Sequence, residues 1–303
     1  MHRRRRLNTR GKIAVSILLF ILILLITWLF GGDKKGAAKE SENIIGNSLD
    51  MLSFSSEPVE AFADSTLSQS IVEKENEKKE VSRQKEYKKQ NQLDQLDKAI
   101  YLTFDDGPSR DTNQLLDILD DYDMTATFFM MGPKMKENPT VVKRTYHKGH
   151  GLALHGITHE VSNIYSSPYA PSEEMVEGQE ILESITGVKS NIVRLPYGTF
   201  PYLTESMRYV LSQNEFNTWD WNVDSMDWDL KDDRYVQHTI QELKRTEEVG
   251  ETPIVLLHDK KETIEYLPEL LSYIKKQGYK AKVLTNDMTP LTFPCAGQCR
   301  QIN

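Results

Sequence analysis

The residues best suited to chemistry in this chain follow short apolar segments. Asp105 and Asp106 come directly after one such run, and His155 and His159 come directly after another. Two histidines four residues apart can bind one cation where the backbone between them is helical or tightly turned. A carboxylate from a neighbouring segment would complete a His₂Asp set with open positions for water, as catalytic zinc sites require.

Three further apolar segments end in polar groups of compatible chemistry. Arg194 can clamp a carboxylate so that it stays ionised. Asp227 follows another segment, and His258 ends a wholly apolar run, where an imidazole can serve as general acid or base. Each group alone has an ordinary explanation as a polar turn or an ion pair. Five apolar segments that each end in such a polar group favour a functional site over five unrelated turns.

Alternating strand and helix patterns from about residue 99 predict how these groups are positioned. The expected strands are Ala99–Phe104, Thr125–Met130, Gly151–Leu154, Ile192–Leu195, Phe216–Val223, Thr252–Leu257 and Lys280–Leu284. Amphipathic segments between them predict helices at Thr112–Asp121, Pro139–Lys148, Ser172–Ile185, Thr204–Gln213, Arg234–Arg245 and Thr263–Gln277. This alternation indicates an α/β fold with a parallel sheet, and a (β/α) barrel and a doubly wound sheet both fit. In either fold ligands bind at the carboxyl ends of the strands.

Charge is distributed unevenly along the 303 residues. Residues 1–96 carry 16 Lys/Arg and 13 Asp/Glu, a net charge of +3, and residues 97–303 carry 21 and 32, a net charge of −11. A strongly acidic globular part would repel phosphates, so we expect no nucleic-acid partner. Neutral substrates such as polysaccharides remain compatible.

The N-terminus predicts a membrane anchor. Residues 1–12 contain five Arg and one Lys, and residues 13–30 are uncharged and almost wholly apolar. Eighteen helical residues span about 27 Å, close to the hydrocarbon thickness of a bilayer. The basic segment is expected to remain cytoplasmic and the rest of the chain to be extracellular. A cleaved signal peptide is the alternative, but the sequence after residue 30 is a poor cleavage site.

Residues 31–97 are predicted to form a charged stalk, either a solvated helix or an extended linker. Residues 98–303 are predicted to form the globular domain. Near the C-terminus, Cys295 and Cys299 flank Ala-Gly-Gln. Outside the cell this pair is expected to close a small disulfide loop.

Five ordered motifs in the globular part resemble those of the polysaccharide deacetylases, carbohydrate esterase family 4 or the NodB-homology domain. They are Thr103–Gly107 (TFDDG), His155–His159 (HGITH), Arg194–Gly198 (RLPYG), Asp224–Trp228 (DSMDW) and Leu256–His258 (LLH). The resemblance covers roughly residues 99–287. It implies a distorted (β/α) barrel of seven or eight strands.

The resemblance also implies a role for each matching residue. Asp106, His155 and His159 would bind one divalent metal ion, most often Zn²⁺. Asp105 would be the catalytic base oriented by Arg194, and His258 the catalytic acid held by Asp227. The backbone N–H of Tyr197 would complete an oxyanion hole. Two apolar residues would line the pocket for the acetyl methyl group: Trp228 and Leu256.

The implied function is metal-dependent removal of acetyl groups from N-acetylglucosamine in bacterial peptidoglycan. Deacetylation of chitooligosaccharide, exopolysaccharide, N-acetylmuramic acid or xylan is the alternative within the family. A catalytically silent glycan-binding module is the alternative outside enzymes. The chain departs from the family pattern at Gly156, where Ser or Thr is more common, and at Leu195, where Pro is more common. Neither departure removes a catalytic group.

Overall fold

The computed structural model describes residues 61–293, with side chains described from residue 74 onward except residue 76. The anchor expected at residues 13–30 and the disulfide expected between Cys295 and Cys299 lie outside this range. Within it, no helix combines the length and apolar character needed to cross a bilayer.

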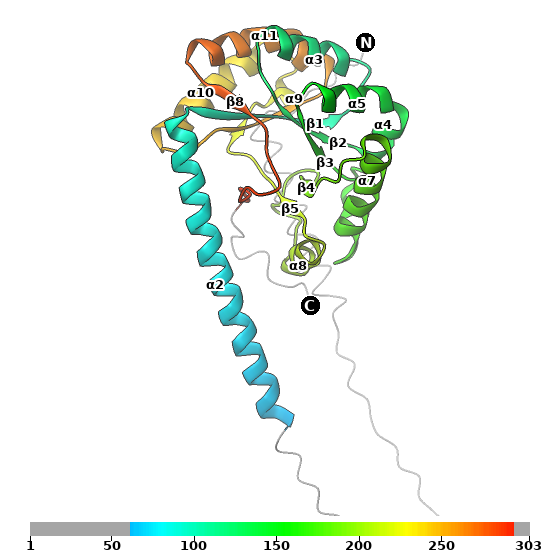
Figure 1. Cartoon of the computed structure of the whole chain (residues 1–303), viewed down its shortest axis with the longest axis vertical. Helices are drawn as coiled ribbons and strands as arrows, with labels where there is room; N and C mark the ends of the chain where they lie inside the picture. Colours follow the sequence, from blue (N-terminus) through cyan, green and yellow to red (C-terminus); the bar gives the residue numbers. More distant parts are fainter. Residues whose placement is uncertain (1–60, 294–303) are drawn as a thin grey trace, which may run out of the picture. The chain divides into compact units, whose positions relative to one another are not determined.

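The described residues form an eight-stranded sheet in which every pairing is parallel (Figure 1). The strand order is β5-β4-β3-β2-β1-β7-β6, and β8 pairs with the start of β1. The strands are β1 (Ala99–Gly107), β2 (Thr127–Met130), β3 (Gly151–Leu154), β4 (Ile192–Val193), β5 (Asn217–Thr218), β6 (Val223–Asp224), β7 (Ile254–His258) and β8 (Lys280–Lys282). The parallel α/β fold expected from the alternation is confirmed.

The one strand expected at 216–223 is instead two, β5 and β6. Trp219 donates its backbone N–H to Val193 in β4, whereas Asn222 donates to Ile254 in β7. The chain therefore changes pairing partner within four residues and crosses from one edge of the sheet to the other. Because no pairing joins β5 to β6 among the described residues, the sheet is a curled, open barrel and not a closed one.

The six expected helices are present, with ends within a few residues of those expected. They are α3 (Thr112–Asp121), α5 (Pro139–His147), α7 (Ala170–Thr186), α8 (Glu205–Gln213), α10 (Arg234–Glu248) and α11 (Lys261–Lys276). Three short helices were not evident from the amphipathic pattern: α4 (Gly132–Glu137), α6 (Val161–Ile164) and α9 (Asp227–Leu230). Each has six residues or fewer, too short to display a helical period.

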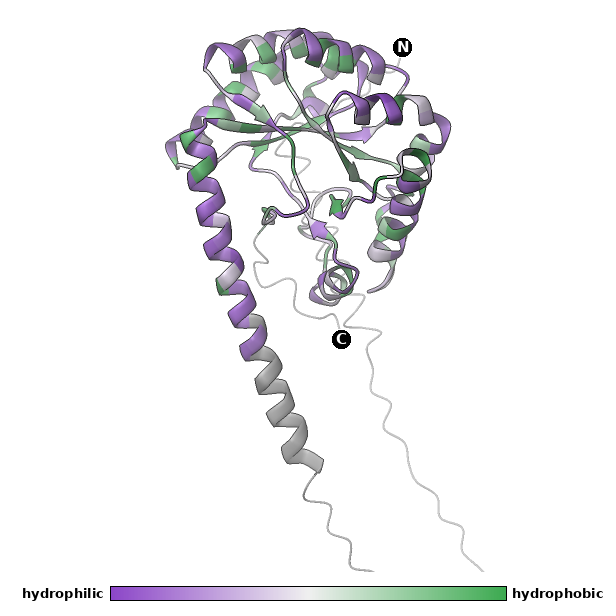
Figure 2. Ribbon diagram, viewed as in Figure 1, coloured by the Kyte–Doolittle hydropathy of each residue, from purple (hydrophilic) through white to green (hydrophobic). Residues whose placement is uncertain are grey.

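Side chains along each strand point alternately to the two faces of the sheet, so the buried apolar residues form two separate clusters. In β1, Leu102 and Phe104 belong to a large cluster packed against the helices, whereas Tyr101 belongs to a second cluster with Phe129 and Trp219. Successive side chains of a strand point to opposite faces, so Asp105 continues the Tyr101 face. In Figure 2 the central strands are coloured largely as hydrophobic, whereas the helices around them mix hydrophobic and hydrophilic residues.

The charged segment before β1 is a helix over its last part, α2 (Ala61–Leu96). Most of its described side chains are exposed, but its C-terminal end is attached to the barrel. The Asn91 side chain exchanges hydrogen bonds with Gly250 and Thr252, at 3.0 and 2.8 Å, and the Tyr101 hydroxyl donates to buried Asp94 at 2.9 Å. Of the two conformations expected for residues 31–97, the helix is therefore found at 61–96.

Candidate active site

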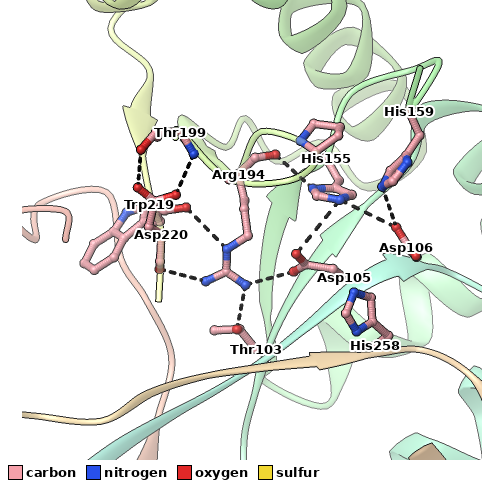
Figure 3. A network of polar contacts seen from close by, with 12 residues as sticks. Thr103, Asp105, Asp106, His155, His159, Arg194, Thr199, Trp219, Asp220 and His258 are labelled. Atoms are coloured by element: carbon pink, nitrogen blue, oxygen red, sulfur yellow. Dashed lines mark hydrogen bonds and ion pairs between the residues drawn. The ribbon is translucent and has the colours of Figure 1, made fainter. Parts of the chain in front are cut away.

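Polar groups that follow four of the five apolar segments meet at one end of the barrel (Figure 3), and Asp227, from the fifth, contacts His258 there. Parallel pairing places their strand ends side by side, since Asp105 in β1 is in register with His258 in β7. β3 and β4 are in register at Leu154 and Val193, so the residues that follow these two also lie next to each other. The residues that follow these strands therefore lie close together.

A β-bulge lets the adjacent carboxylates of Asp105 and Asp106 serve the same site. The register of β1 on β2 shifts between Asp105 and Gly107, which leaves Asp106 as the extra residue. Asp106 has a φ of 72°, in the left-handed region. Without the bulge the two side chains would point to opposite faces of the sheet. The left-handed backbone at Asp106 is costly for a residue other than glycine, and strained residues of this kind cluster at functional sites.

Asp106, His155 and His159 place one ligand atom each within 4.8 Å of one another. The Asp106 Oδ1 atom lies 3.5 Å from Nε2 of His155 and 3.2 Å from Nε2 of His159. The Nδ1 atom of His155 is 2.9 Å from the backbone carbonyl of Arg194, to which it can only donate. This contact directs the Nε2 lone pair of His155 toward the cluster, as in histidines that bind metals.

The chemistry of this donor set fits a divalent metal ion. Asp106 Oδ1 is buried and has no hydrogen-bond partner of acceptable geometry in the described part of the chain, despite its two histidine neighbours. Burial lowers the pKa of His155, which keeps its imidazole neutral and able to bind a metal. Burial would raise the pKa of Asp106, but the contacts with His159 and His155 lower it below its ordinary value.

The Asp105 carboxylate lies beside the cluster and is held by Arg194. Both side chains are buried, and Arg194 Nη1 donates to Asp105 Oδ1 at 2.9 Å and to the Thr103 hydroxyl at 2.7 Å. The remaining guanidinium N–H groups reach backbone carbonyls at Trp219 and Asp220, and the Arg194 guanidinium lies 4.1 Å from the ring centroid of Phe129. The pair leaves Asp105 Oδ2 facing His155, 3.9 Å from its Nε2.

His258 is held by Asp227 on the β7 side of the site. The Nδ1 atom of His258 lies 2.7 Å from Asp227 Oδ1, and Asp227 Oδ2 accepts from the His258 backbone N–H and the Thr263 hydroxyl. Burial would lower the pKa of His258, but the hydrogen bond and charge of Asp227 outweigh it and raise the pKa above its ordinary value. His258 is therefore suited to carrying and donating a proton.

Three other expected site residues lie around this group. Tyr197 has a φ of 69°, and its hydroxyl donates to the backbone carbonyl of His159 at 2.9 Å. Leu256 is buried in β7 two residues before His258, on the same strand face. Trp228 is 45% exposed at the start of α9, directly after Asp227.

The turn that carries Tyr197 is held by Asp220, a residue that no motif in the sequence identifies. The Asp220 side chain is wholly buried and accepts from the Thr199 backbone N–H at 2.9 Å and the Thr199 hydroxyl at 2.5 Å (Figure 3). It also accepts from the Phe293 backbone N–H at 2.6 Å. Its own backbone carbonyl accepts from Arg194. Asp220 thus links the turn, the arginine and the C-terminal segment. An Asp between two tryptophans is the sole sequence signal.

A second residue of this kind, Glu174 in α7, holds the turn between the two histidines. Its carboxylate accepts from the backbone N–H groups of Ile157 and Thr158, at 2.8 and 3.0 Å, and from the Thr158 hydroxyl at 2.6 Å. A Cβ atom on Gly156 would lie 2.9 Å from this carboxylate, and Gly156 has a φ of 86°. The departure from the family pattern at Gly156 therefore leaves room for Glu174.

Fold and site together place a cluster of potential metal ligands and proton-transfer groups at the carboxyl ends of a curled parallel barrel, and comparisons identify the family. A family model of polysaccharide deacetylases matches residues 92–219. The Bacillus subtilis protein YheN, whose name places it among polysaccharide deacetylases, is 43% identical over 197 residues, which cover 64% of this chain and 70% of YheN. A peptidoglycan-N-acetylglucosamine deacetylase of Bacillus cereus is 34% identical over 191 residues, 60% of this chain and 68% of the relative.

A solved structure agrees with these relatives. The crystal structure of a polysaccharide deacetylase from Bacillus cereus superposes with a TM-score of 0.59 at 32% identity, covering 64% of this chain and 96% of that chain. The chain therefore belongs to the polysaccharide deacetylase family.

Proposed function

We propose that this protein is a metal-dependent deacetylase that hydrolyses the acetamide of N-acetylglucosamine residues in cell-wall peptidoglycan. The observation that carries the proposal is the arrangement of the site. An Asp-His-His cluster adjoins a buried carboxylate clamped by Arg194, and the register partner of that carboxylate is a histidine whose own partner raises its pKa. The Bacillus cereus relative with 34% identity is named for this substrate, which supports the choice of glycan.

Asp106, His155 and His159 would hold the metal ion, and two nitrogen donors with one carboxylate suit Zn²⁺. When bound, the ion would activate water and polarise the acetamide carbonyl. These three residues leave the other coordination positions open to water and substrate.

The remaining residues divide the proton transfers between two sides of the site. Asp105, oriented by Arg194, accepts a proton from the attacking water. His258, kept protonated by Asp227, donates a proton to the departing amine nitrogen, which is a poor leaving group without one. The opposite environments of the two groups set the two roles.

The substrate carbonyl is positioned by the turn after β4. The backbone N–H of Tyr197 would donate to the oxyanion that develops during attack, and Asp220 and Thr199 hold that turn in place. Trp228 and Leu256 would enclose the acetyl methyl group. No covalent intermediate is needed.

The proposed cellular location of the catalytic domain rests on the sequence of residues 1–30. The basic residues 1–12 and the apolar residues 13–30 would anchor the chain in the cell membrane with the catalytic domain outside. Residues 31–97, helical at 61–96, would separate that domain from the bilayer. With this topology the site would lie beside the cell wall, where peptidoglycan is the abundant acetylated glycan.

Substitution of Asp227 by Asn is expected to move the alkaline limb of the kcat–pH profile to lower pH. Asp227 raises the pKa of His258, so wild-type His258 stays protonated to a higher pH, and without the carboxylate burial alone would lower that pKa. The profile of acetate release checks this. The matched control is Asp229→Asn, an exposed acid in the same helix, which should leave the limb in place. An unmoved limb in Asp227→Asn would rule out His258 as the acid.

The glycan proposal is tested by locating the new amine. The full-length protein is incubated with purified peptidoglycan, the glycan is digested to disaccharides, and mass spectrometry shows which sugar lost its acetyl group. Loss from glucosamine supports the proposal. Loss from muramic acid keeps the reaction and changes the substrate, and no loss from either sugar rejects peptidoglycan.

A further inference from the structure

A row of aromatic rings begins at the candidate metal ligand His159 and runs outward over the turn after β4. The ring of Tyr197 lies 4.9 Å from that of His159, and the ring of Tyr202 lies 6.2 Å from that of Tyr197, nearly edge-on. Tyr202 in turn lies 5.3 Å from Tyr165. The rings therefore form a continuous surface that adjoins the site.

Three large side chains of this surface are exposed to solvent. Tyr197 is 49% exposed, Tyr202 is 40% exposed, and Phe200, in the same turn, is 41% exposed. We call the exposed faces of Tyr197, Phe200 and Tyr202 the aromatic ledge. Neighbouring exposed apolar side chains bordered by polar groups commonly mark a binding surface. No side chain of the described residues covers these exposed faces.

Polar contacts hold the backbone turn beneath the ledge and one of its three rings. The Tyr165 hydroxyl donates to the backbone carbonyls of Pro196 and Gly198, at 2.8 and 3.2 Å, and Asp220 holds Thr199 in the same turn. Tyr197 is anchored through its hydroxyl to the His159 carbonyl. Because the backbone of this turn is already held in place, less conformational freedom is lost when a ligand packs on the ledge, which favours binding.

We infer that Tyr202, with Phe200, forms a subsite for a sugar ring next to the one that is deacetylated. The inference rests on the proposed function. Sugar rings present a face of C–H groups that packs on aromatic faces, and Tyr adds a hydroxyl at the rim. Three side chains are too small an area for a stable protein interface, which needs about 800 Å² per partner. The net charge of −11 over residues 97–303 favours a neutral ligand.

The test compares wild type with Tyr202→Ala on N-acetylglucosamine oligosaccharides from one ring to six. The subsite predicts that kcat/KM falls about three- to tenfold for the longer oligosaccharides, the effect of one lost aromatic contact, and stays unchanged for the single ring. Tyr202→Phe keeps the ring and should retain most of the activity. The matched control is Tyr209→Ala in α8, where an aromatic side chain 64% exposed lies outside the ledge.

Two results would overturn the inference. A loss equal for all chain lengths would mean that Tyr202 only supports the turn of Tyr197, and no loss would mean that the ledge binds no sugar. If wild type releases no acetate from any oligosaccharide, the proposed function is judged separately, by acetate release from purified peptidoglycan. Calorimetric binding of the six-ring oligosaccharide to wild type and Tyr202→Ala then decides the subsite, since weaker binding by the variant supports it and equal binding refutes it.

Discussion

Acetate release is expected to fall by about 10²–10⁴-fold when Asp105 is replaced by Asn, the usual contribution of a general base. The amide has nearly the same volume but cannot accept a proton from water. Asp105 also lies outside the Asp-His-His cluster, with its Oδ2 3.9 Å from the nearest ligand nitrogen. Metal content and glycan affinity should therefore stay close to wild type. Initial rates on purified peptidoglycan check the first expectation, and metal analysis of the purified variant checks the second.

The matched control for Asp105→Asn is Asp121→Asn, the same change at an exposed carboxylate at the end of α3. It should leave the rate unchanged. A wild-type rate in Asp105→Asn would remove this residue from the mechanism. A variant that also lost its metal would show instead that Asp105 is a ligand.

Replacement of Arg194 by Met is expected to lower the free energy of unfolding by about 3–5 kcal/mol, because a buried carboxylate loses its partner. Arg194 is wholly buried, and its guanidinium also satisfies the Thr103 hydroxyl and two backbone carbonyls. Guanidinium chloride unfolding of the full chain measures the change. Activity should fall as well, because Asp105 loses the group that orients it.

The control for this prediction is Arg144→Met, which breaks a more exposed ion pair with Asp117. A surface pair of this kind contributes about 0–1 kcal/mol, so the variant should be nearly as stable as wild type. Equal stability of the two variants would show that the Arg194 pair adds nothing to the fold.

Much of the fold could be predicted because its signals are local. Apolar runs mark the strands, amphipathic periods mark the long helices, and parallel strands bring their carboxyl ends to one edge. The meeting of Asp105, His155 and Arg194 follows from these facts alone. The spacing of His155 and His159 needs only a tight turn to place both rings on one cation.

The remaining features depend on contacts between distant segments. The break in the strand expected at 216–223 arises because its two halves pair with different strands, β4 and β7. Glu174 and Asp220 hold turns that lie 16 and 21 residues away, and neither stands in a recognisable pattern. The left-handed backbone at Asp106 comes from a bulge that only the register with β2 reveals.

The central claim, a metal-dependent deacetylase, is tested most directly by acetate release from purified peptidoglycan. The full-length protein is assayed as purified, after chelation, and after stoichiometric Zn²⁺ is added back. The proposed chemistry predicts release that chelation abolishes and Zn²⁺ restores, with no restoration in the His155→Ala variant. Release that continues at the same rate in the verified metal-free protein would contradict it.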